Sequence, residues 1–454
     1  MSHKSRGVIS VAPLKIAVCH LFVRSPFRIC LSKVVCTGSI GAYPGIHVAQ
    51  SAVRAFPSGK RRAPARRVHL RAAFVATVLM SLLLIAGVCS SNWLERRYIH
   101  RLARESSILK DQGVVWQRAV FAEDDLLPVY GSSELLKHFG NEPQLFFGNY
   151  PSNFSVSPTG RAGCTSLIHL QKIAAAGVEA RGRKLAICLS PIWFFRQRAP
   201  DRWYAGNFSL AQANQLIFSQ RLSFALKQDV ARRMLDYPGT AEKSPLLLFA
   251  LHRLAVGGQW NRTLYRLVEP LGQLQNAANL AADHFEVSWH ILHDGELAAA
   301  PARKPESINW PSVFAAAERQ ARAGGAGTPD RTARRFSSDQ SFLDVVQNAE
   351  EWNDLELLLR VLRELGLQPL LVNIPMDSVY FRQMGVSQTS LNLYLWRLRE
   401  LAGRYDTALV DFADHREDRW FLGDHHDHFS AKGWMFVNKE LDGFFHAPAK
   451  HAHR

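Results

Sequence analysis

Acidic residues are nearly absent from the first quarter of this 454-residue chain. Residues 1–110 hold 2 of the 39 aspartates and glutamates but 18 of the 55 lysines and arginines. The rest of the chain carries 37 residues of each sign, so the net charge of +16 belongs to the N-terminal segment. A nucleic-acid-binding domain needs clustered basic charge on its folded body. We therefore expect no nucleic-acid partner.

Cysteine is also scarce, with 6 residues in the whole chain. Only Cys164 and Cys188 lie beyond residue 92, and these two can form one disulfide at most. That excludes a domain held together by a framework of disulfides. The sequence has no internal repeat, which excludes a solenoid. Its 47% of hydrophobic residues instead fits a folded protein with a substantial core.

The basic residues of the N-terminal segment lie on either side of one long uncharged run. Residues 72–89 (AAFVATVLMSLLLIAGVC) contain no charged side chain and approach the length needed to cross a bilayer. Basic residues are denser before the run than after it, so the N-terminus is expected in the cytoplasm and the rest outside. A cleaved signal peptide, cut within residues 86–91, is the alternative. A buried core helix is disfavoured because the run has no polar face.

The chain divides into four predicted parts. Residues 1–71 form a basic segment that is cytoplasmic or disordered, and residues 72–91 form a transmembrane anchor. A juxtamembrane stalk follows over residues 92–120. Residues 121–446 form an extracytoplasmic domain, with a helical insertion at about 209–335.

Within this domain, short apolar runs followed by Gly, Ser, Pro or Asp alternate with longer helical patterns. Strands are predicted at 126–130, 144–149, 184–190, 368–374 and 408–412. Helices are predicted at 344–365, at 390–404 and over most of 209–300, with a mobile excursion at 301–335. This alternation predicts an α/β fold with a parallel sheet flanked by helices.

Two serines follow the first predicted strand directly. Ser132 and Ser133 would then lie at the carboxyl end of a parallel sheet, where functional groups collect. A serine at the start of a helix lies near unpaired backbone N–H groups, which can stabilise an oxyanion. The plainer interpretation is that one of these serines only caps the helix.

A second group of reactive side chains lies almost three hundred residues later. Residues 424–428 (DHHDH) combine three histidines with two aspartates. A serine hydroxyl becomes a nucleophile when a neutral imidazole accepts its proton and a carboxylate holds the other ring nitrogen. His428 with Asp424 or Asp427 supplies both groups. The alternatives are a solvated polar loop and a zinc site, although ligands so close in sequence rarely converge on one ion.

Five segments, in order, resemble motifs of the DltD family, whose members are membrane-anchored relatives of the SGNH hydrolases. The segments are VYGSSEL at 129–135, GRAGCTSLIH at 160–169, LSPIWF at 189–194, VNIPM at 372–376 and HFSAKGW at 428–434. The resemblance covers most of residues 120–445. It implies an SGNH-hydrolase-like α/β fold with a helical insertion and an N-terminal transmembrane helix.

The resemblance also implies roles for individual residues. Aligning Gly131-Ser132-Ser133 with the Gly-Asp-Ser core of the wider superfamily makes Ser133 the nucleophile, and His428 becomes the general base. The backbone N–H groups of Ser133 and Gly163 would form the oxyanion hole. Asn373 is a candidate for the asparagine of the superfamily's third motif, with a polar residue that only ends the strand as the plainer interpretation.

The catalytic acid departs from the family pattern. The family usually places its aspartate three residues before the histidine, where this chain has His425. We prefer Asp424 as the acid, because neighbouring side chains in an extended loop point apart, which disfavours Asp427 as the partner of His428. Asp427 stays the alternative.

The function implied by the resemblance is D-alanylation of an extracytoplasmic envelope polymer by a single-pass membrane protein, through an acyl-serine intermediate. The implied partners are an MBOAT-type membrane acyltransferase and the acceptor polymer, and no cofactor or metal is expected. Two alternatives remain open. One is a non-catalytic tether for the polymer or the acyltransferase, and the other is an O-acetyl-ester transferase or esterase on polysaccharide.

Overall fold

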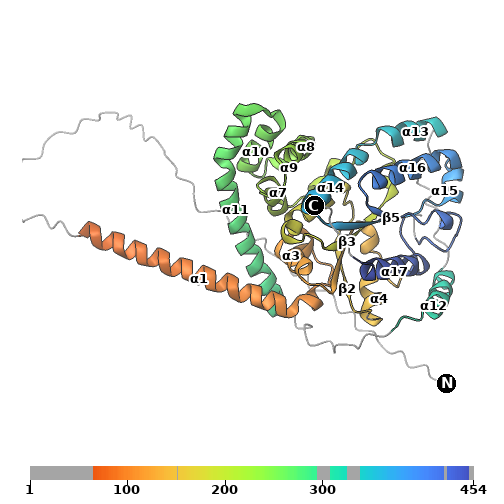
Figure 1. Ribbon diagram of the computed structural model, residues 1–454, viewed down its shortest axis with the longest axis horizontal. Coiled ribbons are helices and arrows are strands. Elements are labelled where there is room, and N and C mark those ends of the chain that lie inside the picture. The colour runs from red at the N-terminus through yellow and green to blue at the C-terminus, as the bar shows by residue number, and fades with distance from the viewer. Residues whose placement is uncertain (1–64, 151, 294–306, 325–337, 424–426, 449–454) are drawn as a thin grey trace, which may run out of the picture. The chain divides into compact units, whose positions relative to one another are not determined.

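Residues 65–150, 152–293, 307–324, 338–423 and 427–448 are described by the computed structural model of the chain (Figure 1). A five-stranded sheet forms its centre, in the order β2-β1-β3-β4-β5, and every neighbouring pair is parallel. The strands are β1 (Leu126–Gly131), β2 (Ser155–Gly160), β3 (Lys184–Leu189), β4 (Gln368–Asn373) and β5 (Ala408–Val410). The predicted α/β class with a helix-flanked parallel sheet is confirmed.

The two faces of the sheet are covered by different helices, because successive strand residues point to opposite sides. Leu127 and Val129 of β1 face one apolar cluster, and Tyr130 faces the other. The Leu127 side is covered by α4 (Pro143–Asn149), α12 (Trp310–Ala323) and α17 (Ala431–His446). The Tyr130 side is covered by α5 (Ser166–Ala176), α7 (Leu210–Ile217), α8 (Phe224–Leu235), α10 (Pro245–Val256), α13 (Asp339–Asn348), α14 (Glu351–Leu365) and α16 (Gln388–Arg404).

The predicted strand at 144–149 is wrong, because these residues form α4. Pro143 occupies its first turn, a position that favours helix initiation, but a short apolar run alone does not distinguish strand from helix. The sequence analysis missed the neighbouring strand β2, whose sequence SVSPTG contains Pro158. β2 lies at the edge of the sheet, where proline is well tolerated, although the inner strands β1 and β4 also contain one each, Pro128 and Pro369.

Two helical predictions also need correction. The excursion expected at 301–335 contains α12, whose Val313 and Ala317 are buried in the cluster that α17 joins; residues 301–306 and 325–335 lie outside the described residues. The helix expected at 344–365 is divided into α13 and α14, with a break at residues 349–350. The region 209–293 is helical as predicted, through α7, α8, α9 (Pro238–Ala241), α10 and α11 (Gly258–His293).

One helix, α1 (Ala65–Leu102), contains the whole predicted span 72–91. From Val68 onward it is long and apolar enough to cross a membrane, and its most apolar stretch is not buried by the described residues. It is therefore compatible with a single-pass membrane anchor.

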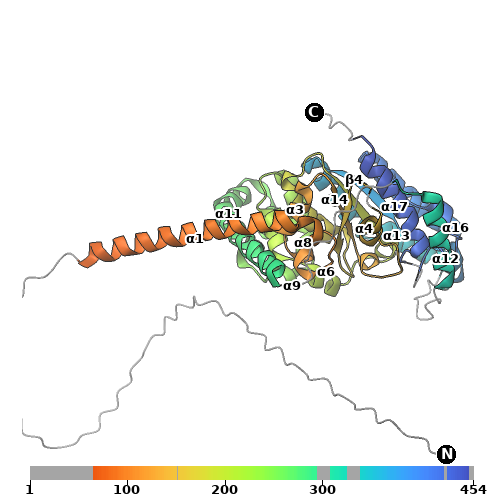
Figure 2. The same ribbon diagram turned by 90° about the horizontal axis from the view of Figure 1, so that it is seen from below.

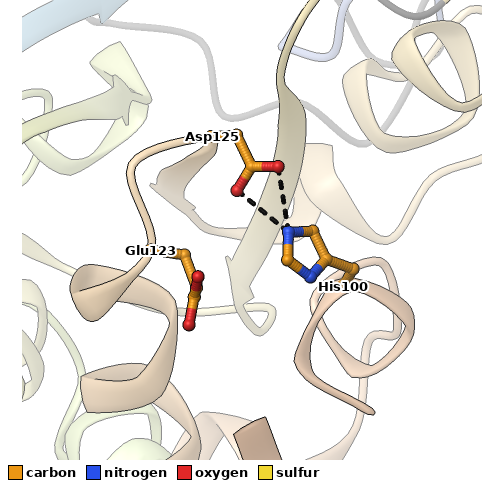
Figure 3. Close-up of side chains that lie close together, drawn as sticks. All are labelled: His100, Glu123 and Asp125. Atoms are coloured by element: carbon orange, nitrogen blue, oxygen red, sulfur yellow. Dashed lines mark hydrogen bonds and ion pairs between the residues drawn. The ribbon is translucent and has the colours of Figure 1, made fainter. Parts of the chain in front are cut away.

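The last turns of α1 pack into the domain. Ile99 and Leu102 are buried against Val287 and Ile291 of α11 and against Trp116 of α3 (Val115–Ala122). Beside this cluster, His100 pairs with Asp125, which precedes β1, at 2.9 Å (Figure 3). The segment 92–120, predicted as a stalk, thus includes residues in the core as well as the end of α1.

Candidate active site

Ser132 and Ser133 follow the carboxyl end of β1, and Ser133 begins a 3₁₀ turn, Ser133–Leu135. Ser132 is buried: its Oγ accepts a hydrogen bond from the N–H of Gly163 at 3.1 Å and donates one to the carbonyl of Arg161 at 3.4 Å. Ser133 is only partly buried. Of the two hydroxyls, that of Ser133 is thus the one open to a substrate.

The imidazole of His428 lies against this hydroxyl. Its Nε2 is 2.9 Å from Oγ of Ser133, although the two residues are 295 positions apart in the chain. The loop before α17 holds His428 in place. The backbone carbonyl of His428 accepts a hydrogen bond from the N–H of Gly423, and the N–H of Ser430 donates one to the carbonyl of Phe421. Phe429, between them, is fully buried. His428 itself is 6% exposed, so its ring is fixed rather than solvated.

A carboxylate lies on the other side of the ring. Oδ1 of Asp427 is 2.7 Å from Nδ1 of His428. The loop is not extended here as expected: the backbone turns at residues 427 and 428, which brings the two neighbouring side chains together. Asp424, the preferred acid, lies outside the described residues, as do His425 and His426 of the zinc alternative.

Gly163 is close to the serines, but its N–H is directed to Ser132. Its φ of +88° is in the left-handed region, and a Cβ there would collide with the ring of Trp203, so only glycine fits. To stabilise an oxyanion on a substrate, this N–H must leave the Ser132 hydroxyl. Asn373 ends β4 fully buried, and its Oδ1 accepts the hydroxyl of Tyr394 at 2.7 Å.

Glu134 is a charged group of the site that the sequence analysis did not single out. It is 1% exposed, and its Oε1 accepts the backbone N–H of Ser132 at 2.5 Å. Burial raises the pKa of this carboxyl to about 7; the N–H of Ser132 and the imidazole of His428 act in the opposite direction. The only signal for it in the sequence is its position directly after the two serines, in the segment VYGSSEL.

We expect Glu134→Gln to change how stability depends on pH. A carboxyl whose pKa is raised in the folded state binds more protons there than in the unfolded chain, so it lowers stability as pH rises from 4.5 to about 7. Because of this carboxyl, the free energy of unfolding falls by roughly 3 kcal/mol between these two pH values. Relative to the wild type, the variant should gain stability with rising pH, as measured by thermal unfolding of the full chain in detergent. Parallel curves for the two proteins would contradict this.

A buried ionic network supports the second loop of the site, residues 161–165. Glu351 of α14 accepts the N–H of Ser166 at the start of α5, at 2.7 Å. Next to it, Asp354 receives two hydrogen bonds from Arg233, through Nε at 2.6 Å and Nη2 at 3.1 Å. Asp354 is 2% exposed, so the guanidinium compensates a carboxylate that water does not reach.

We expect Arg233→Ala to destabilise the domain by about 3–5 kcal/mol, because it leaves a buried carboxylate without its cation. The neighbouring Arg232 offers a matched control: its side chain is 56% exposed and pairs with Asp229, so Arg232→Ala should cost about 1 kcal/mol or less. Unfolding in urea, followed by tryptophan fluorescence, measures both. Equal losses in the two variants would show that the network contributes no more than a surface pair.

One group among the described residues has ligand atoms placed closely enough to hold a metal ion. It consists of His100, Glu123 and Asp125, whose ligand atoms lie within 4.8 Å of one another (Figure 3). Asp125 precedes β1 and Ser133 follows it, so the six residues of the strand, about 20 Å, separate the group from the serine. It does not belong to the Ser133 site.

The fold and the site define a class: an α/β protein with a parallel sheet, a serine–histidine pair at its carboxyl edge and one apolar N-terminal helix. The family model described as DltD protein matches residues 103–446, so the chain belongs to the DltD family. Proteins of this family take part in D-alanylation of teichoic acids, together with other Dlt proteins.

Two relatives are similar over most of their length. Protein DltD of Bacillus subtilis (strain 168) is 23% identical over 398 residues, which cover 82% of this chain and 97% of the relative. Protein DltD of Staphylococcus aureus (strain NCTC 8325 / PS 47) is 22% identical over 384 residues, or 82% of this chain and 92% of the relative.

Proposed function

We propose that the protein is a membrane-anchored serine acyltransferase or esterase that acts in D-alanylation of an extracytoplasmic envelope polymer. The observation that carries the proposal is the 2.9 Å contact between Nε2 of His428 and Oγ of Ser133, in a chain of the DltD family. A serine that is partly accessible and bonded to a buried imidazole is the arrangement that activates a hydroxyl for acyl transfer.

In the proposed reaction, neutral His428 accepts the proton of the Ser133 hydroxyl while Oγ attacks the carbonyl carbon of an ester or thioester. The tetrahedral intermediate collapses as the imidazolium protonates the leaving oxygen or sulfur, and the acyl group stays on Ser133. A polymer hydroxyl, or water, then gives its proton to His428 and attacks the carbonyl carbon of the acyl-serine. The bond from that carbon to Oγ breaks, and the imidazolium of His428 returns the proton to Oγ, which restores both residues.

The surrounding groups have supporting roles in this proposal. Asp427, whose Oδ1 lies 2.7 Å from Nδ1 of His428, favours the proton on Nδ1, which leaves Nε2 free to act as a base, and its charge stabilises the imidazolium that forms. The backbone N–H groups of Ser133 and Gly163 donate hydrogen bonds to the oxyanion, after the bond from the N–H of Gly163 to the Ser132 hydroxyl has broken.

The anchor determines which partner can deliver the acyl group. With the N-terminus in the cytoplasm, the domain lies outside, where a cytoplasmic carrier cannot reach Ser133. An MBOAT-type membrane acyltransferase is therefore the proposed direct partner. The esters added to the polymer carry ammonium groups, which reduce the attraction of an anionic envelope for cationic peptides.

Trapping the acyl group tests the proposal. The full chain in detergent is treated with a fluorophosphonate serine probe, and the labelled peptide is identified by mass spectrometry; we expect the label on Ser133. In cells, a D-alanyl adduct on the same serine is the expected product. An acetyl adduct would indicate an O-acetyl-ester enzyme, and label on another residue would overturn the site.

A further inference from the structure

The outward face of α11 is apolar over most of its length. Five of its large side chains, Leu267, Leu271, Leu274, Trp289 and Leu292, are each between 57% and 70% exposed, and Phe285 is 40% exposed. Between them the exposed positions are mainly alanine and Pro270. A helix on the surface of a water-soluble domain normally turns its polar face outward, so this arrangement is inverted.

Polar contacts on the inward face fix this orientation. Asp283 is 8% exposed, and its Oδ2 accepts the N–H groups of Val114 and Val115 at 2.6 and 2.7 Å. Asn276, also 8% exposed, reaches the carbonyl of Asn214. Rotating the helix to bury its leucines would break these bonds and leave Asp283 unpaired, so the apolar face stays outward.

The same helix is attached to the membrane-spanning candidate. Phe285 lies beside Gly87 of α1, inside the uncharged run, so closely that a Cβ on Gly87 would meet its ring, and His284 pairs with buried Glu95 at 2.8 Å. The C-terminal end of α11 crosses α1 (Figures 1 and 2). The rest of α11 lies on the side of the domain that faces the N-terminal half of α1. The apolar surface of α11 therefore continues that of α1.

Aromatic and basic residues lie close to the point where the two helices meet. Trp93 of α1 is 61% exposed and is followed by exposed Arg96 and Arg97, and Trp289 of α11 is 66% exposed. Tryptophan is enriched at the boundary between lipid tails and headgroups, and arginine beside it can contact anionic headgroups.

From this placement we propose that the outward face of α11 lies on the outer surface of the lipid bilayer, as an interfacial helix beside the anchor α1. Such helices bury their apolar face about 5–10 Å into the boundary between headgroups and acyl chains. Lipid is the occupant that fits a face continuous with the uncharged run of α1. The inference rests on α1 being a retained anchor, as the proposed function requires.

Lipid quenching of a fluorophore tests this in the full chain, reconstituted alone into lipid nanodiscs. Cys19, Cys30, Cys36 and Cys89 are replaced by serine. The thiols of Cys164 and Cys188 are buried, with raised pKa, and stay unlabelled. Bimane is then placed at Leu271→Cys on α11. Leu79→Cys in the uncharged run reports on the anchor, and Trp396→Cys, an equally exposed apolar position on α16, is the matched control.

A nitroxide near the headgroup end of the acyl chain should quench the probe at 271 more than a nitroxide near the methyl end, and the probe at 396 should be quenched by neither. Quenching at 79 without quenching at 271 would overturn the inference and leave the anchor intact. No quenching at either position would remove the anchor as well. Shielding of 271 only after the membrane acyltransferase is added would assign the face to a protein partner and overturn the lipid assignment.

Discussion

Ser133→Ala should lower the rate of acyl transfer by about 10⁴-fold or more, because in the proposed mechanism Oγ of Ser133 is the atom that carries the acyl group. Ester-linked D-alanine in the envelope of cells that carry the variant should fall to the level found without the protein. Labelling by the fluorophosphonate probe should be lost. Protein abundance and Tm are measured in parallel, since Ser133 is partly exposed and its loss should not unfold the domain.

The neighbouring serine is the matched control for that experiment. Ser132→Ala removes the hydroxyl that occupies the N–H of Gly163 and leaves the contact between Ser133 and His428 in place. We expect this variant to keep the probe reactivity. If Ser133→Ala left envelope D-alanine unchanged at normal protein level, the protein would act as a tether for the polymer or the acyltransferase.

Asp427→Asn should lower the rate by about 10⁴-fold, as expected when the carboxylate that orients a catalytic histidine is lost. An asparagine amide can donate to Nδ1 and so favour the tautomer in which Nε2 carries the proton and cannot act as a base. The rate of labelling of Ser133 by the probe, compared with the wild type at several pH values, measures the loss without requiring the acyltransferase.

Asp424→Asn is the control that decides between the two aspartates. With Oδ1 of Asp427 at 2.7 Å from the ring, we expect Asp424→Asn to stay close to wild type. A large loss in Asp424→Asn with little change in Asp427→Asn would restore Asp424 as the acid.

The inner strands of the sheet could be predicted from the sequence more reliably than the elements at its edge. The strands β1, β3 and β4 each contain a buried apolar run, at 126–130, 185–189 and 370–372, and such runs are typical of strands covered on both faces. At the edge, β2 contains a proline and two serines, and α4 is an apolar run too short to show its period. Whether each of these segments forms a strand or a helix depends on the elements it packs against, and the local residue pattern holds no information about them.

The candidate site divides in the same way. Ser133 and His428 were predicted from residue type and motif, and the structure brings them into contact. Glu134, the burial of Ser132 and the turn that directs Asp427 to the ring all depend on how loops from distant strands meet. The outward face of α11 is a similar case: its leucine spacing would suit a core, and only the contacts of Asp283 show which side is buried.

If α1 is the proposed anchor, its unbroken course limits the distance over which the Ser133 site can move relative to the membrane. At 38 residues, the helix is about 57 Å long, roughly twice the thickness of the hydrocarbon layer, and its final turns are clamped into the domain core. In the proposed function, α1 joins the domain without a flexible linker among the described residues, so Ser133 would be held at a fixed height above the lipid. Polymer segments would then have to reach that height to be acylated, because the domain does not swing on a flexible tether.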